Sequence, residues 1–393
     1  MPSPTTSKFS LSIFAICAPG LEQILISELK ELGVGRTEAT EGGVAFNGDL
    51  ALLYKANLWL RTASRVIVRV ARFHADSFHE LERRAKQIPW DGYVAKGARV
   101  QFRVTCRKSR LYHSDAVAER LAESIVKRVG DVNVGKPEVK RSDEEEQQVA
   151  VDARSQLFIA RLDHDECTIS ADSSGALLHR RGYREASGKA PLRETLAAAM
   201  VLSSGWDRRS PLVDPFCGSG TIAIEAALIA RRIAPGLRRD FAFHSWPTSD
   251  ERVWTALKTV ANESSKNGSI GALLASDRDD GVVELARENS TRASVSDDIQ
   301  FQSKPISAIE LPPGPAFIVT NPPYGIRVGE RGALRNLYAQ FGNVLRKKAR
   351  GCTVMLLSAD KTLDKMVGIQ LSEILRTRNG GIPVRFVKGR VEP

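Results

Sequence analysis

The sequence has few cysteines and histidines, and they lie far apart along the chain. The six histidines show no spacing typical of metal ligands, and the cysteines form no Cys-x-x-Cys pair at positions 17, 106, 167, 217 and 352. An odd number of scattered cysteines argues against a disulfide framework and against a structural zinc site. We therefore expect no disulfide framework and no structural zinc site, and we expect the protein's chemistry to need no metal.

Long apolar runs are also missing, because none approaches the roughly 20 residues that cross a bilayer. Segment 9–18 is apolar, but Ser10 and Ser12 interrupt it and only Lys8 precedes it. We interpret this segment as a first strand rather than a signal peptide, and expect a cytoplasmic protein without a membrane partner. The 393 residues are 42% hydrophobic and 26% charged, which suits two or three soluble domains.

Positive charge is in excess and is unevenly distributed. The net charge is +11, with a pI of about 9.5. Segment 61–130 alone holds 16 Lys and Arg against 7 Asp and Glu. This pattern favours a phosphate-contacting face, although a solvated surface is the simpler alternative. The densest group stands beside Tyr112 and His113 and consists of Arg103, Arg107, Lys108 and Arg110.

The first half of the chain alternates strand-like and helix-like patterns. Apolar residues recur at helical spacing after the strand 9–17, and further strands are expected at 65–71 and 99–106. Helices are expected at 78–88 and 115–129. The pattern predicts a small α+β module with an antiparallel sheet. A second basic cluster follows at 178–184 and contains Arg180, Arg181 and Arg184.

From residue 211 the pattern becomes strand, loop and helix in repetition, which is typical of a parallel sheet. We place the domain boundary near 190, where Ser187, Gly188 and Lys189 form a flexible break before an Ala-rich helix. The C-terminal part is thus predicted to be a doubly wound α/β domain with mostly parallel strands.

The strand 316–319 ends in the stretch Thr320-Asn321-Pro322-Pro323-Tyr324-Gly325. Two prolines make this strand end stiff. In an open α/β sheet it would lie where ligands bind. The Asn321 side-chain oxygen and the Pro322 carbonyl could accept both hydrogens of an amino group on an aromatic ring, and Tyr324 could stack on that ring. The alternative is a proline-rich turn that closes a core strand.

A second constellation follows the strand at 211–213, where Asp214 precedes Gly218, Gly220 and Thr221. The string also satisfies the dinucleotide fingerprint Gly-x-Gly-x-x-Ala. Against that interpretation, Asp214 would face the pyrophosphate, and Asp277 lies much farther along the chain than the roughly 20 residues expected for the acid that binds the ribose of a dinucleotide. S-adenosylmethionine fits better, since it has a ribose and a cationic end but no phosphate. We predict that Asp277 binds the ribose and Asp214 the cationic end; a helix N-cap is the alternative for Asp277.

With these motifs assembled, the chain resembles the THUMP-domain class I RNA methyltransferases, and most of all the bacterial large-subunit (23S) rRNA guanine-N2 methyltransferases. The resemblance covers nearly the whole chain. It is carried in order by Pro19-Gly20-Leu21-Glu22, Asn57-Leu58-Trp59-Leu60-Arg61-Thr62, Ile88-Pro89-Trp90, residues 178–184, 190–197 and 214–221, Phe243-His244-Ser245-Trp246-Pro247 and the stretch from Thr320.

The resemblance implies a Rossmann-like methyltransferase domain with a seven-stranded, mostly parallel sheet, and an N-terminal ferredoxin-like and THUMP module. It implies these limits: ferredoxin-like 1–60, THUMP 61–172, linker 173–190 and methyltransferase 191–393. Asp214, Gly218, Gly220 and Asp277 match the family's cofactor positions, and Asn321, Pro322 and Tyr324 match its amino-group site. The family often has an acid after the third strand, but here Ser303-Lys304-Pro305-Ile306 has no carboxylate.

We therefore expect an S-adenosylmethionine-dependent enzyme that methylates the exocyclic N2 of a guanine, in 23S rRNA. Three alternatives stay open: the same reaction on tRNA, amino-methylation of DNA adenine or of a protein glutamine, and an RNA-binding ribosome-assembly factor with a vestigial catalytic domain. Seven residues are expected to contact RNA, namely Arg103, Arg107, Lys108, Arg110, Arg180, Arg181 and Arg184. Oligomeric state and the modified nucleotide do not follow from the sequence.

Overall fold

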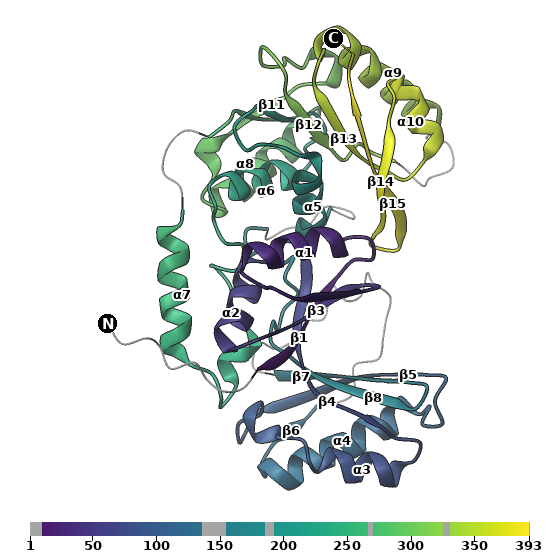
Figure 1. The fold of residues 1–393 in the computed structure, drawn as a ribbon. Coiled ribbons are helices and arrows are strands. Elements are labelled where there is room, and N and C mark those ends of the chain that lie inside the picture. The colour runs from purple at the N-terminus through teal and green to yellow at the C-terminus, as the bar shows by residue number, and fades with distance from the viewer. Residues whose placement is uncertain (1–9, 136–154, 185–191, 266–269, 325–330, 393) are drawn as a thin grey trace. The chain divides into compact units, whose positions relative to one another are not determined.

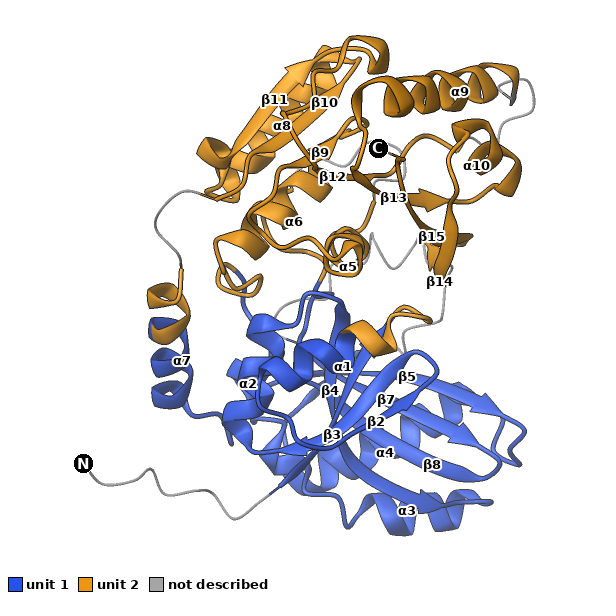
Figure 2. Cartoon of the chain, turned by 45° about the horizontal axis from the view of Figure 1, so that its top comes forward, with its two compact units in different colours: residues 1–17, 25–178, 239–259 blue, residues 18–24, 179–238, 260–393 orange. Residues whose placement is uncertain are grey.

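The computed structural model describes residues 10–135, 155–184, 192–265, 270–324 and 331–392. The chain divides into two compact units, which Figure 2 shows in different colours. Unit 1 comprises residues 1–17, 25–178 and 239–259, and unit 2 comprises residues 18–24, 179–238 and 260–393. Ser187, Gly188 and Lys189, where the sequence predicts a break, lie outside the described residues.

Unit 1 is built on an eight-stranded sheet with the order β2-β3-β1-β4-β8-β7-β5-β6 (Figure 1). Strand β1 pairs antiparallel with both β3 and β4, so that Ile13 lies opposite Phe46 on one side and Val68 on the other. The predicted ferredoxin-like and THUMP segments therefore share one sheet. Its strands are β1 (Leu11–Cys17), β2 (Thr37–Thr40), β3 (Gly43–Gly48), β4 (Ala63–His74), β5 (Arg99–Arg107), β6 (Asn133–Val134), β7 (Ser155–Asp163) and β8 (Glu166–Asp172).

The expectation of an antiparallel sheet in the first half is wrong for two strand pairs. Strand β5 runs parallel to both β7 and β6. The cause is the helix α4 (Ser114–Val129), which carries the chain back after β5 so that β6 begins at the same end. The other described helices that begin in this half are α1 (Glu22–Glu31), α2 (Leu50–Trp59) and α3 (Phe78–Ala85).

Residues 239–259 complete unit 1, although the sequence-based limits place them in the methyltransferase domain. They include the 3-10 helix η3 (Ala242–Ser245) and most of α7 (Glu251–Glu263). The buried Phe243 ring stacks on Tyr54 of α2, with ring centroids 4.2 Å apart. Trp246 Nε1 donates to Gln156 Oε1 of β7 at 2.6 Å. Each compact unit is thus made of several separate segments of the chain. The domain limits expected from the sequence give each domain one continuous segment, and they stay a prediction.

Unit 2 contains the seven-stranded sheet β11-β10-β9-β12-β13-β15-β14. Strands β11, β10, β9, β12 and β13 are parallel, and β15 runs antiparallel to both of its neighbours. This confirms the mostly parallel sheet that the repetition from residue 211 predicts. The strands are β9 (Leu212–Asp214), β10 (Leu273–Asp277), β11 (Ile299–Ser303), β12 (Phe317–Thr320), β13 (Thr353–Ser358), β14 (Ser372–Asn379) and β15 (Ile382–Arg390).

Helices surround this sheet and close its core. Phe341 and Leu345 share one buried cluster with Ile318 of β12 and Val354 of β13. The helices of this part are α5 (Glu194–Ser204), α6 (Thr221–Ala230), α8 (Asp280–Arg292), α9 (Arg331–Lys348) and α10 (Lys361–Val367). Among the described helices, none has the length and apolar character needed to span a membrane.

The position of β9 in the sheet determines where a ligand can bind. The chain continues from β9 to β10 and β11 on one side, and then crosses to β12 on the other. This makes the carboxyl ends of β9 and β12 a topological switch point, the place where open α/β sheets bind their ligands. The two motifs that the sequence singles out follow these two strands.

Candidate active site

The ends of β9 and β12 are joined by one hydrogen bond between buried side chains. The strands are parallel and in register, with Ile318 opposite Val213. Asp214 ends β9 one residue beyond these paired positions, and Thr320 ends β12 two residues beyond them. Thr320 Oγ1 donates to Asp214 Oδ1 at 2.6 Å. The predicted cofactor loop and the predicted amino-group loop therefore start from two residues that touch.

Asp214 is fully buried, and one of its oxygens has no partner. Burial raises the pKa of this carboxyl from 3.8 to about 7. The bonds from Thr320 and from the Phe216 N–H lower it, while the nearby charge of Asp277 raises it again. Asp214 Oδ2 has no hydrogen-bond partner among the described residues. A buried acceptor left in this state costs free energy, on the order of 1–3 kcal/mol, unless a ligand supplies a donor.

The glycine turn after Asp214 brings the backbone close to α8 on one side and leaves space on the other. Gly220 has φ of +82°, and a Cβ there would lie 3.0 Å from the Ala286 Cβ. Gly218 has φ of +52°, and a Cβ there would meet nothing within 4 Å. Asn289 of α8 supports the turn by donating to the Ser219 carbonyl at 3.1 Å. The open side at Gly218 is where a ligand could pass close to the backbone.

Asp277 is placed beside this turn by the end of β10. Its Oδ2 accepts from the Gly218 N–H at 3.1 Å, and its Oδ1 accepts from the Asp279 N–H at 3.2 Å. The N-cap of α8 is Asp279, whose side chain accepts from the Val282 N–H at 3.1 Å. The alternative interpretation of Asp277 as a helix N-cap is therefore wrong. Its carboxylate holds the glycine turn and keeps further lone pairs for a ligand.

The amino-group loop presents a second buried acceptor. Asn321 Oδ1 has no hydrogen-bond partner among the described residues, and Pro322 is buried. The Tyr324 hydroxyl accepts from Asn379 Nδ2 of β14 at 2.8 Å, and burial raises the pKa of that hydroxyl. Gly325 lies outside the described residues. The loop thus offers a side-chain oxygen that needs a donor, and an aromatic ring whose hydroxyl is held by the edge strand β14 of the same sheet.

Three side chains that shape the site were not among the sequence-based candidates. Thr320 stands directly before Asn321, but its role depends on a contact with Asp214 that the local pattern does not reveal. Asn379 begins a turn with Gly380, which indicates a hairpin and gives no hint of Tyr324. Asn289 is a buried polar residue on a helix, and only its spatial neighbour Ser219 explains it.

Cys217 lies within the cofactor loop and is buried. Burial raises the pKa of its thiol far above the ordinary value, and the charges of Asp214 and Asp277 act in the same direction. The thiol therefore stays protonated at neutral pH, which agrees with a packed side chain rather than a nucleophile.

The seven arginines and lysines expected to contact RNA fall into two groups. Arg107, Lys108 and Arg110 are exposed at the end of β5 and after it, and Arg103 within that strand is half-buried. The arginines of the cluster 178–184 lie in unit 2, where Arg180 is half-buried.

The other two arginines of that cluster face the interior of unit 2. Arg181 is buried, with its Nε 3.5 Å from Glu225 Oε1. Arg184 donates to Thr221 Oγ1 and lies 3.6 Å from Glu194 Oε1. These contacts hold the segment against α5 and α6, so both side chains have a structural partner that the sequence did not indicate. Through Thr221, Arg184 supports the helix that follows the cofactor turn.

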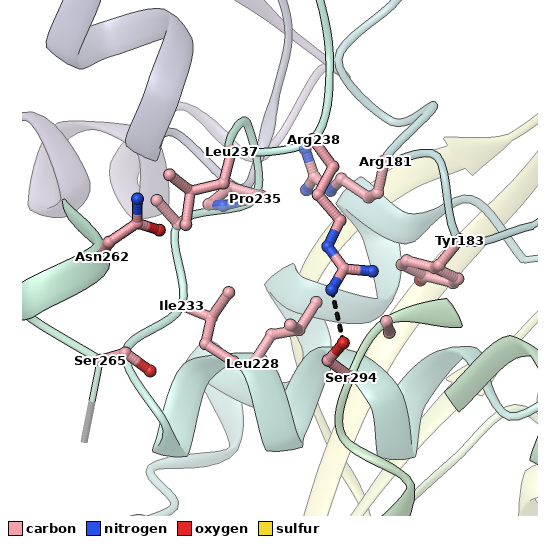
Figure 3. A pocket seen from close by; sticks show the side chains of 12 residues that line it. Arg181, Tyr183, Leu228, Ile233, Pro235, Leu237, Arg238, Asn262, Ser265 and Ser294 are labelled. Carbon is pink, nitrogen blue, oxygen red and sulfur yellow. Dashed lines mark hydrogen bonds between the residues drawn. The ribbon is translucent and has the colours of Figure 1, made fainter. Parts of the chain in front are cut away.

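A cavity of about 270 Å³ lies in unit 2 away from this site, at the end of α6 opposite to Thr221 (Figure 3). Leu228 and Ile233 contribute apolar walls, and Arg238 donates to Ser294 Oγ at the rim. The Arg238 guanidinium also donates to the Arg292 carbonyl, so two of its donors are used within the protein.

Three stretches of the chain match known sequence families. Residues 181–388 match the family described as an RMKL-like methyltransferase domain. Residues 12–67 match the RlmL ferredoxin-like domain, and residues 75–140 match the THUMP domain.

Curated relatives and solved structures agree with these matches. The chain is 37% identical to a "Putative RNA methyltransferase" of Synechocystis, over 98% of this chain and 99% of that protein. It is 34% identical to "Ribosomal RNA large subunit methyltransferase K/L" of Syntrophotalea carbinolica, over 96% of this chain but only 53% of the relative. The chain thus spans about half the length of that relative. A crystal structure named "a putative methyltransferase complexed with SAH" matches with a TM-score of 0.85 and 28% identity, covering 98% of this chain and 100% of the other.

Substitution of Gly218 tests whether a ligand passes beside the glycine turn. We expect Gly218→Ala to weaken S-adenosylhomocysteine binding by at least about tenfold in calorimetry, because the new methyl group would fill the open side of the turn. Gly33→Ala is the matched control, since Gly33 also has a positive φ and a Cβ there would also meet nothing within 4 Å. Both variants should lose similar thermal stability. Equal cofactor affinity in the two variants would contradict the assignment.

The raised pKa of Asp214 predicts a pH-dependent affinity. Only the ionised carboxyl attracts the ammonium group at the amino-acid end of S-adenosylhomocysteine, so affinity should rise by about tenfold as pH increases from about 6 to about 8, through the pKa near 7. Thr320→Val removes a bond that favours the ionised form, so the midpoint of this rise should move to higher pH, whereas Thr320→Ser should keep it. Asp214→Asn should abolish the rise. Titration calorimetry with S-adenosylhomocysteine between these pH values measures all four proteins; identical profiles would refute the role of Asp214.

Proposed function

Because this chain belongs to the family of THUMP-domain RNA methyltransferases with an RMKL-like methyltransferase domain, we propose that it transfers a methyl group to the exocyclic N2 of a guanine in 23S rRNA. Dependence on S-adenosylmethionine and an RNA substrate come with the family. We further propose that the methylated atom is the guanine N2, that the substrate is the large-subunit rRNA, and that the protein is cytoplasmic.

The buried acceptors at the switch point support this proposal most strongly. Asp214 Oδ2 and Asn321 Oδ1 lie on the loops that follow two adjacent strands, and neither has a partner among the described residues. An acid suits the cationic amino-acid end of S-adenosylmethionine, and a neutral oxygen suits an amino group. The residues present therefore fit the cofactor, with Asp214, Gly218, Gly220, Thr221 and Asp277 proposed to hold it.

Bound in this site, the cofactor supplies an electrophilic methyl group on a sulfonium centre. The lone pair of a guanine amino nitrogen is delocalised into the ring and makes a weak nucleophile. In the proposal, Asn321 Oδ1 and the Pro322 carbonyl accept its two hydrogens and favour a pyramidal nitrogen, whose developing positive charge they stabilise. Tyr324, held by Asn379, stacks on the base. Placing the sulfonium, its methyl group and the guanine nitrogen in one line supplies much of the rate enhancement. The nitrogen loses its proton once it carries the methyl group.

The adenine of the cofactor needs a contact that is not a carboxylate at the usual place. Strand β11 ends at Ser303, which is exposed, and Lys304 follows it. The Lys304 N–H donates to the Asp277 carbonyl at 2.8 Å, so this backbone is tied to β10. We propose that the Ser303 hydroxyl or a backbone group takes the place of the missing acid.

RNA contact is proposed for four cations of unit 1, the exposed Arg107, Lys108 and Arg110 and the half-buried Arg103, with Arg180 as an additional candidate. Arg181 and Arg184 remain from the predicted set, but their contacts with Glu225, Glu194 and Thr221 favour a structural role. A guanine must leave its stack to reach the loop, so single-stranded or partly unfolded RNA is the favoured substrate.

The choice of 23S rRNA over tRNA is supported by the name of the K/L relatives, and this chain spans only about half of their length. A mass-spectrometric map of N2-methylguanosine in rRNA and tRNA from a deletion strain separates the two substrates. Methyl transfer to RNA, DNA and protein measured side by side tests the DNA adenine and glutamine alternatives. Calorimetry tests the assembly-factor alternative, because a vestigial domain would bind no cofactor.

Asn321 is the residue on which the amino-group site depends. We expect Asn321→Ala to keep cofactor affinity within about twofold and to lower the single-turnover rate by at least about a hundredfold, because one acceptor of the amino group is lost. The exposed Asn262 provides a control, and Asn262→Ala should behave like the wild-type protein. Unchanged single-turnover methyl transfer in Asn321→Ala would reject this role.

A further inference from the structure

Tyr112 stands out on the described surface. It lies between β5 and α4 in unit 1, and 69% of its area is exposed. Among the exposed large hydrophobic side chains of the described residues it is the only aromatic one. Its ring lies against His113, with centroids 4.1 Å apart and planes tilted by 41°. Two neighbouring rings thus face solvent, where a planar ligand can reach them.

The loop that carries Tyr112 is held by a buried side chain and by hydrogen bonds to the turn between β7 and β8. Leu111, the preceding residue, is buried. The Arg110 N–H donates to Asp165 Oδ1 at 2.7 Å, and the Asp165 N–H donates to Ser109 Oγ at 3.0 Å. The His164 N–H donates to the Arg107 carbonyl at 3.2 Å. The turn between β7 and β8 therefore holds the loop in one conformation, so that a partner would bind it without first ordering the backbone.

Cations accompany the exposed ring. Arg107 and Lys108 are exposed and form no ion pair with any residue that the structure describes. Arg110 is also exposed, but its guanidinium pairs with Asp76 at 2.7 Å. Two unneutralised cations within five residues of an exposed aromatic ring match the chemistry of a single-stranded nucleic acid, in which bases alternate with phosphates.

We propose that Tyr112, supported by His113, is a stacking site for one unpaired RNA base, and that Arg107 and Lys108 contact the phosphates beside it. The inference deepens the proposed function, on which it rests, by naming a site on unit 1 that recognises a base by its face. Base pairs within a duplex offer no free face, so the site selects unpaired RNA. One ring with two cations is too small a surface for a stable protein interface.

The test uses the full chain and two fluorescein-labelled strands of about 12 nucleotides, oligouridylate and a strand of the same length built from abasic ribose units. Fluorescence anisotropy gives the dissociation constants at several KCl concentrations. We compare the wild-type protein with Tyr112→Ala, Tyr112→Phe and Lys108→Ala. Val126→Ala is the matched control, since Val126 of α4 is an exposed apolar residue of the same unit.

Stacking predicts that the wild-type protein binds oligouridylate about tenfold more tightly than the abasic strand, and that Tyr112→Ala loses this preference. Tyr112→Ala should bind the abasic strand with the same affinity and the same salt dependence as the wild-type protein. Tyr112→Phe should retain the preference. Lys108→Ala should weaken both strands alike and reduce the slope of log K against log salt by about 0.7. Val126→Ala should match the wild-type protein on both strands.

Two results would overturn the stacking site: equal binding of both strands by the wild-type protein, or an equal loss on both strands in Tyr112→Ala. Neither result touches the proposed methylation, which the Asn321 variants test on an rRNA fragment. Conversely, absence of methyl transfer to any RNA by a chain that binds the cofactor would contradict the proposed function, whatever the anisotropy shows. A circular-dichroism melt of each variant checks that the exposed substitution leaves the fold intact.

Discussion

The bond between Thr320 and Asp214 is the interaction on which the site depends. A carboxylate removed from water is costly, and a hydroxyl donor at 2.6 Å offsets part of that cost. Because the two residues end adjacent strands, the bond also sets the distance between the glycine turn and the diproline loop. On the far side of β9, Asp277 holds the same turn through the Gly218 N–H. Three strand ends are thereby joined through polar groups.

Much of this site could be predicted because its chemistry is carried by residue types at strand ends. Asp214, Asp277 and Asn321 follow apolar runs, and parallel strands bring such positions to one edge of a sheet. Contacts between distant residues could not be predicted in this way. Asn379 meets Tyr324 across 55 positions of sequence, and Asn289 meets Ser219 across 70. Nothing in the local pattern of either asparagine reveals its partner.

The exposure of charged residues could not be predicted from local sequence either. The clusters around Arg107 and Arg181 look alike in sequence, since both place arginines beside a tyrosine. The fold separates them, because Arg107 faces solvent whereas Arg181 is buried against Glu225. A count of cations therefore indicated a polyanionic partner correctly in kind, but it could not say which arginines are available to it. The parallel pairing of β5 could not be predicted from its own residues either. It depends on α4, which follows β5 and returns the chain to the end of the sheet where β6 begins.

The placement of Phe243 and Trp246 has a consequence for biosynthesis. These aromatic residues fill the interior beside Tyr54 and Gln156, yet they are translated long after them. Unit 1 therefore cannot complete its core before residue 259 has been synthesised, when about two thirds of the chain has been made. Until then Tyr54 and Gln156 lack these two partners. Unit 1 is thus completed late in translation, when β9 is the one described strand of unit 2 that has already been made.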